Sequence, residues 1–320
     1  MTDKLALTQP TGKLGSATLR SLLAKSLIPP TSLVLSTSSS PSDPRLAQYA
    51  SQGITIKHAT YDSHDSMVAA WRGCTRLFLI SSPAIDLDYY DAAPGSGREK
   101  HHIAAIRAAR EAGVKHVYYA SLAFGSNSKA GVMVAHNRTE DFLREYTATG
   151  QPGEGMTYTI IREGLYNESW PLYLGQYEMQ KDEREVVPVG GDSKISWTGI
   201  EDLGLANAMV LSDEPAKWAG KMFYLSAGKE NARTLEEVAG IVSRIRGKDV
   251  KVKVVEQEEY ERYCMEERGQ DEGNVKWWSK SYVALRRNEC HISDSTLEEL
   301  LTRKGKKPKI LETTIEEMLK

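Results

Sequence analysis

His136 and Glu140 are the residues of this chain whose types and spacing best suit proton transfer. Histidine changes its charge near neutral pH, and an acid four residues further along a helix lies on the same helix face. We expect His136 to orient a substrate or to shuttle a proton, with Glu140 holding its ring. The alternative is an exposed pair on a solvated helix face.

The stretch LALTQPTGKLGSATLRSLL, residues 5–23, could bind a phosphate group. A short apolar run, a loop and a helical pattern follow one another here, and amides at such a helix N-terminus attract anions. Gly12 and Gly15 supply two of the three glycines of a dinucleotide-binding loop, while Gln9 stands at the first position. Because Pro10 follows, we expect Gln9 to be extended and the loop to be wider than in the tightest form of the motif. The alternative is an ordinary strand-to-helix turn.

The end of the second predicted strand bears on the choice of cofactor. An acid about 20 residues beyond the loop would bind a ribose hydroxyl and repel a phosphate, but no acid stands there. The hydroxyls of Ser36–Ser39 take its place, and Lys13 and Arg45 could bring positive charge to a 2′-phosphate. We therefore predict NADP(H) rather than NAD, although a flexible solvated loop also explains the serine run.

The elements that must position these residues alternate between strands and helices. Apolar patterns predict strands at 5–8, 32–38, 54–61, 75–82, 114–121 and 156–163, and helices at 14–23, 43–52, 65–73, 98–113 and 131–150. This alternation implies right-handed crossovers and an α/β fold with a doubly wound parallel Rossmann sheet, whose ligands sit beyond the carboxyl ends of the strands. The alternation weakens after Tyr166. We therefore expect an NADP-binding domain at 1–165 and a smaller C-terminal substrate lobe at 166–320 that partly returns strands and helices to the core.

The composition argues against several classes of protein. With 320 residues, 40% apolar side chains and a formal net charge of −2, the chain can bury a large core and has little electrostatic attraction for nucleic acid. No run suits a membrane helix, and the start, MTDKLALT, does not suit a signal peptide. Three widely spaced cysteines suggest neither a disulfide framework nor a zinc site, so we expect a cytoplasmic protein without a metal. The neighbours His101 and His102 should face different directions, which disfavours a metal site there.

Several segments together resemble the NmrA-like branch of the atypical short-chain dehydrogenase/reductase superfamily. This branch includes NAD(P)H:quinone reductases and fungal biosynthetic reductases. The matching segments cover most of the chain and include PTGKLG, DSHDSMVAAWRGCTRLFLISS, AAREAGVKHVYYASL, AHNRTEDFLRE, YTIIREGLYNES and WTGIEDLGLANAMVLSD. Their order and spacing make the resemblance specific.

The resemblance implies which residues contact a cofactor. It places Thr8, Gly12, Lys13, Leu14 and Gly15 at the dinucleotide, Thr37 and Ser38 near the adenosine ribose, Ser81, Ser82 and Pro83 near the nicotinamide ribose, and Ser121, Leu122 and Tyr166 at the nicotinamide. Gln9 and Glu163 depart from the family pattern, in which glycine and proline are common at these positions.

Most short-chain dehydrogenases use a tyrosine and a lysine four residues apart, but the helix predicted after the fifth strand has His136 and Glu140 at that spacing instead. The candidate catalytic residues are therefore His136, Glu140, Ser121 and Tyr166. A quinone, an enone or an iminium needs less help from an acid than a simple ketone does, because the cofactor supplies the difficult step. We predict an NADP(H)-dependent reductase of a conjugated or cationic small organic acceptor, a monomer or homodimer, with a role in fungal secondary metabolism.

Two other functions agree with the same residues. A redox-neutral enzyme would keep the nucleotide and use Glu163 or Glu168 to promote iminium formation or cyclisation. A regulator of the NmrA-like type would bind the dinucleotide as a redox sensor and pass its state to protein partners.

Overall fold

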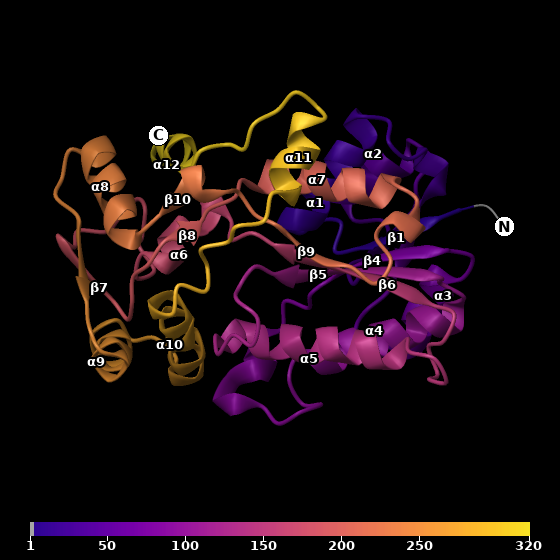
Figure 1. Cartoon of the computed structure of the whole chain (residues 1–320), viewed down its shortest axis with the longest axis horizontal. Helices are drawn as coiled ribbons and strands as arrows, with labels where there is room; N and C mark the ends of the chain where they lie inside the picture. The colour runs from indigo at the N-terminus through magenta and orange to yellow at the C-terminus, as the bar shows by residue number, and fades with distance from the viewer. Residues whose placement is uncertain (1–2) are drawn as a thin grey trace.

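The computed structural model describes residues 3–320, and its centre is a seven-stranded parallel sheet (Figure 1). The strand order is β3-β2-β1-β4-β5-β6-β9. The bounds are β1 (Leu5–Thr8), β2 (Leu33–Thr37), β3 (Thr55–His58), β4 (Arg76–Ile80), β5 (His116–Leu122), β6 (Thr157–Glu163) and β9 (Met222–Leu225). The predicted doubly wound parallel α/β fold is thus confirmed.

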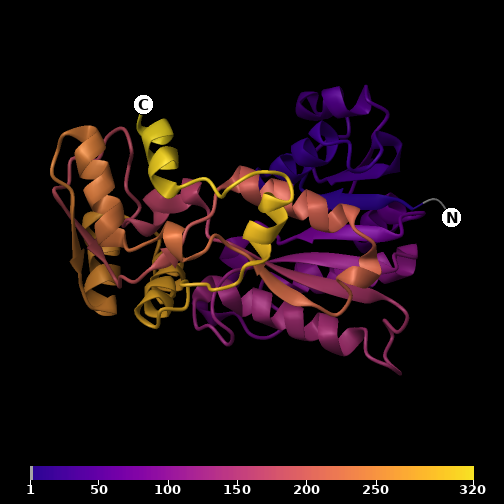
Figure 2. The same ribbon diagram turned by 45° about the horizontal axis from the view of Figure 1, so that its top comes forward.

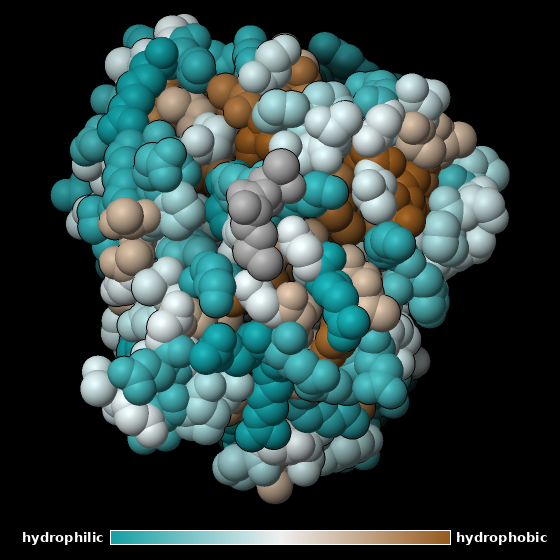
Figure 3. Space-filling model, turned by 90° about the vertical axis from the view of Figure 1, so that its right-hand side faces the viewer, coloured by the Kyte–Doolittle hydropathy of each residue, from teal (hydrophilic) through white to brown (hydrophobic). Residues whose placement is uncertain are grey.

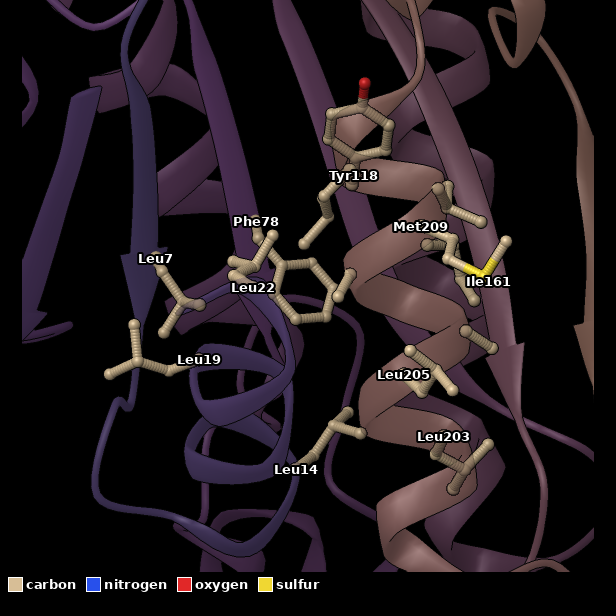
Figure 4. Close-up of a cluster of buried hydrophobic side chains, with 14 of the residues drawn as sticks. Leu7, Leu14, Leu19, Leu22, Phe78, Tyr118, Ile161, Leu203, Leu205 and Met209 are labelled. Carbon is tan, nitrogen blue, oxygen red and sulfur yellow. The ribbon is translucent and has the colours of Figure 1, made fainter. Parts of the chain in front are cut away.

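Helices cover both faces of this sheet. On one face α1 (Lys13–Ala24) packs along α7 (Ile200–Ser212), with α11 (Thr296–Thr302) beside α7, and α2 (Pro44–Ala50) lies near the outer strands. On the other face lie α3 (His64–Trp71), α4 (Glu99–Ala112) and α5 (Gly131–Tyr146). Figure 4 shows leucines of α1 and α7 meeting Phe78, Tyr118 and Ile161 of the sheet.

Strand β5 contributes side chains to the helix layers on both faces of the sheet. Tyr118 belongs to the apolar cluster under α1 and α7, whereas the next residue, Tyr119, belongs to the cluster under α3, α4 and α5. Successive residues of a strand point to opposite faces, so neighbouring tyrosines face different helices. Local signals also end helices as predicted: Gly113 follows α4 with a φ of 93°, a left-handed conformation that glycine adopts without strain.

The second half of the chain builds a separate apolar cluster beside the sheet (Figure 2). Two small sheets pair β7 (Val186–Val189) with β11 (Lys251–Val254) and β8 (Ile195–Ser196) with β10 (Ala232–Arg233). The remaining helices are α6 (Trp170–Tyr173), α8 (Leu235–Arg246), α9 (Gln257–Arg262), α10 (Glu272–Arg286) and α12 (Leu311–Leu319). The same half also returns α7 and β9 to the central sheet.

The surface is predominantly hydrophilic where the strands begin. Figure 3 shows this side of the molecule, with apolar side chains confined to small recessed areas. Within residues 3–320, every helix is too short or too polar to cross a bilayer.

Candidate functional site

The loop after β1 turns at Gln9, in a conformation opposite to the one we expected. Gln9 has a φ of 52°, in the left-handed region, so the prediction of an extended Gln9 before Pro10 is wrong. Its side chain explains the difference, because Nε2 donates hydrogen bonds to Ile80 O at 3.1 Å and Ser81 O at 2.7 Å at the end of β4. These bonds offset the strain of a left-handed residue that is not glycine.

The turn brings its own backbone against helix α1. Gly12 N donates to Gln9 O at 3.0 Å, and a Cβ built on Gly15 would lie 2.2 Å from the same oxygen. Only glycine fits at position 15. A Cβ on Gly12 would lie 3.4 Å from Gln9 O, which is ordinary contact. Gly15 is therefore required by the loop itself, while Gly12 keeps the helix N-terminus open to a ligand.

A groove of about 500 Å³, here called the nucleotide groove, runs over the ends of β1, β2 and β3. Six of the predicted cofactor residues line it, namely Thr8, Gly12, Thr37, Ser38, Ser82 and Pro83. Arg45 is not among its lining residues: the guanidinium binds the Asp43 carboxylate through contacts of 2.6 to 3.2 Å on the exposed start of α2. The expected contribution of Arg45 to a 2′-phosphate is therefore not supported.

A second cavity of about 340 Å³, here called the central cavity, lies beyond the ends of β1, β4, β5 and β6. It shares Gln9, Gly12, Ser82 and Pro83 with the nucleotide groove, so the two form one continuous depression. Its lining includes every predicted site residue except Thr8, Thr37, Ser38 and Glu140, namely Gly12, Lys13, Leu14, Gly15, Ser81, Ser82, Pro83, Ser121, Leu122, His136 and Tyr166.

His136 and Glu140 are both buried, so the alternative of an exposed pair is wrong. The expectation that Glu140 holds the ring of His136 is also wrong. The Glu140 carboxylate accepts hydrogen bonds from Ser121 Oγ at 2.6 Å and from Arg162 Nε and Nη2 at 3.0 and 2.8 Å. Arg162 is buried on β6 directly beneath α5, and an isolated charge there would be costly. The carboxylate therefore turns to Arg162, and its role is to hold Ser121.

The ring of His136 is held by Tyr119 and, through it, by His102. Tyr119 Oη lies 2.9 Å from His136 Nδ1 and 3.2 Å from His102 Nδ1, while Ser82 N donates to His102 Nε2 at 2.9 Å. Neither Tyr119 nor His102 is among the predicted catalytic residues. One signal in the sequence was available. His102 and His136 lie on two successive predicted helices, and the strands before these helices end at the same edge of the sheet.

This chain of contacts fixes the tautomer of His136. Since Ser82 N–H can only donate, His102 Nε2 accepts and the ring carries its proton on Nδ1. That proton is donated to Thr139 Oγ1 at 2.8 Å. Tyr119 cannot donate to the protonated Nδ1 of His102, and its hydroxyl donates to His136 Nδ1 at 2.9 Å. Burial first, and then the nearby Arg98, hold the pKa of His136 well below its usual value, so the ring is neutral. Its remaining proton lies on Nε2, the nitrogen for which no protein partner is found within residues 3–320.

His101 and His102 lie in different surroundings, His101 beside Tyr61 and His102 beside Tyr119, but both contact Ser82. His101 Nδ1 lies 2.9 Å from Ser82 Oγ, so both histidines contact the same residue after β4. No cluster of three or more His, Cys, Asp or Glu side chains suited to a metal occurs within residues 3–320.

Arg98 is a cation at the edge of the central cavity that the sequence analysis did not select. Its Nε binds the buried Asp88 carboxylate at 2.6 Å, and Nη1 donates to Ser82 O at 3.2 Å and Ser81 Oγ at 3.3 Å. The guanidinium thus fixes the loop after β4 and brings positive charge to the cavity wall. With Lys13 at the other side, the cavity can receive an anionic ligand.

The residues present fit a dinucleotide. The open N-terminus of α1 has no acid in its first turn, the nucleotide groove is rich in hydroxyls, and the central cavity has two cations and apolar walls. Groove and cavity together follow the carboxyl ends of the strands, where ligands of such sheets bind.

Comparisons with known proteins agree with this geometry. The model of the NmrA-like family matches residues 1–277. An NmrA-like family domain-containing oxidoreductase, flvB, of Aspergillus flavus is 28% identical over 79% of this chain and 75% of its own length. Quinone oxidoreductase 2 of Escherichia coli is 30% identical over 77% of this chain and 76% of its own.

Solved structures extend the likeness to nearly the whole chain. The structure of an NADPH-dependent quinone oxidoreductase of Escherichia coli complexed with NADPH has a TM-score of 0.77 and 27% identity, covering 99% of this chain and 100% of that one. Triphenylmethane reductase of Citrobacter sp. complexed with NADP(H) has a TM-score of 0.75 and 25% identity, covering 98% and 99%.

Proposed function

The chain belongs to the NmrA-like family, and we propose that it is an NADP(H)-dependent oxidoreductase. The acceptor is a conjugated or cationic small organic molecule such as a quinone, an enone or an imine. The observation that carries this proposal is the continuous depression formed by the nucleotide groove and the central cavity, which ends at the neutral donor His136. The quinone and triphenylmethane reductases named above support it, since both are complexes with NADPH or NADP(H).

The dinucleotide is held by the residues around α1 and the strand ends. Gly12, Lys13, Leu14 and Gly15 receive the phosphates at the helix N-terminus, with Thr8 beneath the loop and Thr37 and Ser38 at the adenosine end. Ser81, Ser82, Pro83, Ser121, Leu122 and Tyr166 surround the nicotinamide end. When bound, the reduced cofactor supplies a hydride.

The chain's own contribution is to orient the acceptor and to exclude water. His136 Nε2–H donates a hydrogen bond to an acceptor atom that gains electron density. Glu140 is a positioning residue: it accepts a hydrogen bond from Ser121, and Ser121 lines the central cavity. The lining of the central cavity has no tyrosine and lysine four residues apart, which favours acceptors that take a hydride without a strong acid.

Several finer properties belong to the same proposal. Residues 1–165 form the NADP-binding domain, and residues 166–320 form the substrate lobe that closes the central cavity through Tyr166. The free thiols of Cys74, Cys264 and Cys290 support a cytoplasmic location. A fungal relative supports a role in fungal secondary metabolism, and we expect a monomer or homodimer that binds a small molecule rather than nucleic acid.

The proposal is tested by titrating the protein with NADPH and NADH while following nicotinamide fluorescence and thermal stability. NADPH is expected to bind more tightly, and a panel of quinones, enones and iminium ions is expected to oxidise it. Binding without turnover, together with a change in oligomeric state, would instead indicate a regulator. Product without cofactor consumption would indicate a redox-neutral enzyme.

The role of His136 is tested through Tyr119→Phe, which removes the hydroxyl that fixes its tautomer. We expect kcat to fall by roughly tenfold while the affinity for NADPH is unchanged. Nitrogen NMR of the imidazole should show the proton on Nε2 in the wild type and a mixture of tautomers in the variant. A single tautomer in both proteins would contradict this role.

A further inference from the structure

Glu163 is a buried carboxyl group at the wall of the central cavity, at the end of β6. It is 1% exposed, and its nearest neighbours on the adjacent strands, Leu122 of β5 and Leu225 of β9, are apolar. The structure gives it one polar partner, Asn207 on α7. The carboxyl group therefore has neither a cation nor water-like surroundings to stabilise a charge.

The contact with Asn207 decides which oxygen of Glu163 is free. Asn207 Nδ2 donates to Leu203 O at 2.9 Å and to Glu163 Oε2 at 3.0 Å. Because Leu203 O can only accept, the amide orientation is fixed and Oε2 acts as the acceptor. Oε1 has no partner within residues 3–320. A proton on this carboxyl group therefore sits on Oε1, a buried oxygen of a residue that lines the central cavity.

Burial raises the pKa of Glu163 to about 8, so the group is mostly protonated at neutral pH. The other titratable groups of the central cavity suit proton release less well. His136 is neutral, and burial raises the pKa of Tyr166. Lys13 and Arg98 are the cavity's cations, and the structure places neither in a hydrogen bond with Glu163. An acid whose pKa lies near the working pH is the most effective proton donor.

We propose that Glu163 is the proton donor of this site, passing the proton on Oε1 to neutral acceptors as they are reduced. This inference rests on the proposed function. A neutral enone gains a hydride at carbon from the reduced dinucleotide, and the displaced electron pair on its oxygen takes the proton from Oε1. Solvent then returns a proton to the carboxylate. An iminium ion gains the hydride alone and needs no proton. Reduction of an enone should therefore depend on Glu163, and reduction of an iminium ion should not.

The protonation of Glu163 is tested first without any turnover. An infrared difference spectrum of the wild type against Glu163→Gln should contain the C=O band of a protonated carboxyl group at pH 6. The band should disappear as the pH rises through about 8. The matched control is Asp202→Asn, which changes another buried carboxyl group of raised pKa, at the start of α7 and outside the central cavity. Absence of the band from the wild-type spectrum at pH 6 would overturn the proposal.

The second test compares cyclohexenone with N-methyl dihydroisoquinolinium as acceptors for NADPH oxidation. Glu163→Gln keeps the shape of the side chain and the contact with Asn207 but has no acidic proton. We expect kcat/KM for the enone to fall by about tenfold or more and kcat/KM for the iminium to change less than about twofold. The decline of the wild-type enone rate above pH 8 should be lost in the variant, and Asp202→Asn should keep the wild-type profile.

The outcomes separate the inference from the proposed function. If the wild type reduces both acceptors and Glu163→Gln does so equally well, or loses both equally, the role of Glu163 is wrong and the reductase function stands. If the wild type binds NADPH and reduces neither acceptor, the reductase function is wrong, and the donor role built on it falls even where the infrared band is present.

Discussion

At the scale of single residues, the contact between Gly15 and Gln9 determines the shape of the phosphate loop. Gln9 takes a left-handed conformation without being glycine, and its amide bonds to the end of β4 hold it there. Gly15 must then lack a side chain, because the Gln9 carbonyl occupies the place of a Cβ. The loop thus replaces its missing first glycine with a hydrogen-bonded side chain.

The two glycines of this loop should differ in their effect on stability. We expect Gly15→Ala to lower the free energy of unfolding by about 1–3 kcal/mol, because backbone must move to admit the methyl group. Gly12→Ala should cost less than about 1 kcal/mol, since its Cβ makes ordinary contact at 3.4 Å. Urea denaturation of the two variants measures this difference. Equal losses in both variants would contradict the close approach at Gly15.

At the scale of elements, a buried ion pair joins helix α5 to strand β6. Glu140 of α5 and Arg162 of β6 are both buried, and Arg162 also donates to Phe124 O at 3.0 Å beyond β5. The pair positions Ser121, so a change in it affects the wall of the central cavity as well as the stability of the fold.

Breaking this pair should cost far more than breaking an exposed one. We expect Glu140→Ala to lower the free energy of unfolding by roughly 3–5 kcal/mol, because it leaves the Arg162 charge buried without an anionic partner. The double variant Glu140→Leu and Arg162→Met should recover most of this loss. Glu201→Ala, which breaks the exposed pair with Arg20, is the control and should cost less than about 1 kcal/mol. Similar losses in Glu140→Ala and Glu201→Ala, measured by urea denaturation, would rule out a buried charge as the cause.

At the scale of the whole molecule, buried titratable groups make stability depend on pH in opposite directions. Burial lowers the pKa values of His102, His116 and His136, so below pH 6.5 these three side chains bind more protons in the unfolded chain than in the folded one. Their contribution to stability is complete above that pH and is lost as the pH falls. Glu163 acts in the other sense, because its raised pKa gives a contribution that is complete below about pH 4.5 and is lost as the pH rises towards 8.

His116 allows one of these contributions to be isolated. Burial lowers its pKa from 6.5 to about 4, and its ring contacts the hydroxyls of Thr157 and Thr159 at the amino end of β5. We expect His116→Asn to remove about 1.4 kcal/mol per pH unit from the slope of unfolding free energy between pH 6 and pH 4. Chemical denaturation across this range measures both slopes. Parallel profiles for variant and wild type would mean that His116 is not neutral in the folded state.

Local sequence patterns were enough to predict the order of elements and the edge of the sheet at which the cavities lie. Apolar periodicity and turn residues act over a few neighbouring positions, so the strand, loop and helix at residues 5–24 and the helix cap at Gly113 could be predicted. The topology of a parallel sheet then brings the ends of β1, β4, β5 and β6 together. For this reason the residues predicted to surround a nicotinamide do line one cavity.

The partners and the protonation of the buried polar side chains depend on the packing of the whole fold. The spacing of His136 and Glu140 gave a shared helix face, but Arg162, 22 residues away from Glu140, took the carboxylate. Glu163 depends in the same way on Asn207, 44 residues further along. The free energy of a buried polar group is set by desolvation and by whichever donor or acceptor the packing brings within hydrogen-bond distance. Those partners come from distant segments, and local sequence patterns do not identify them.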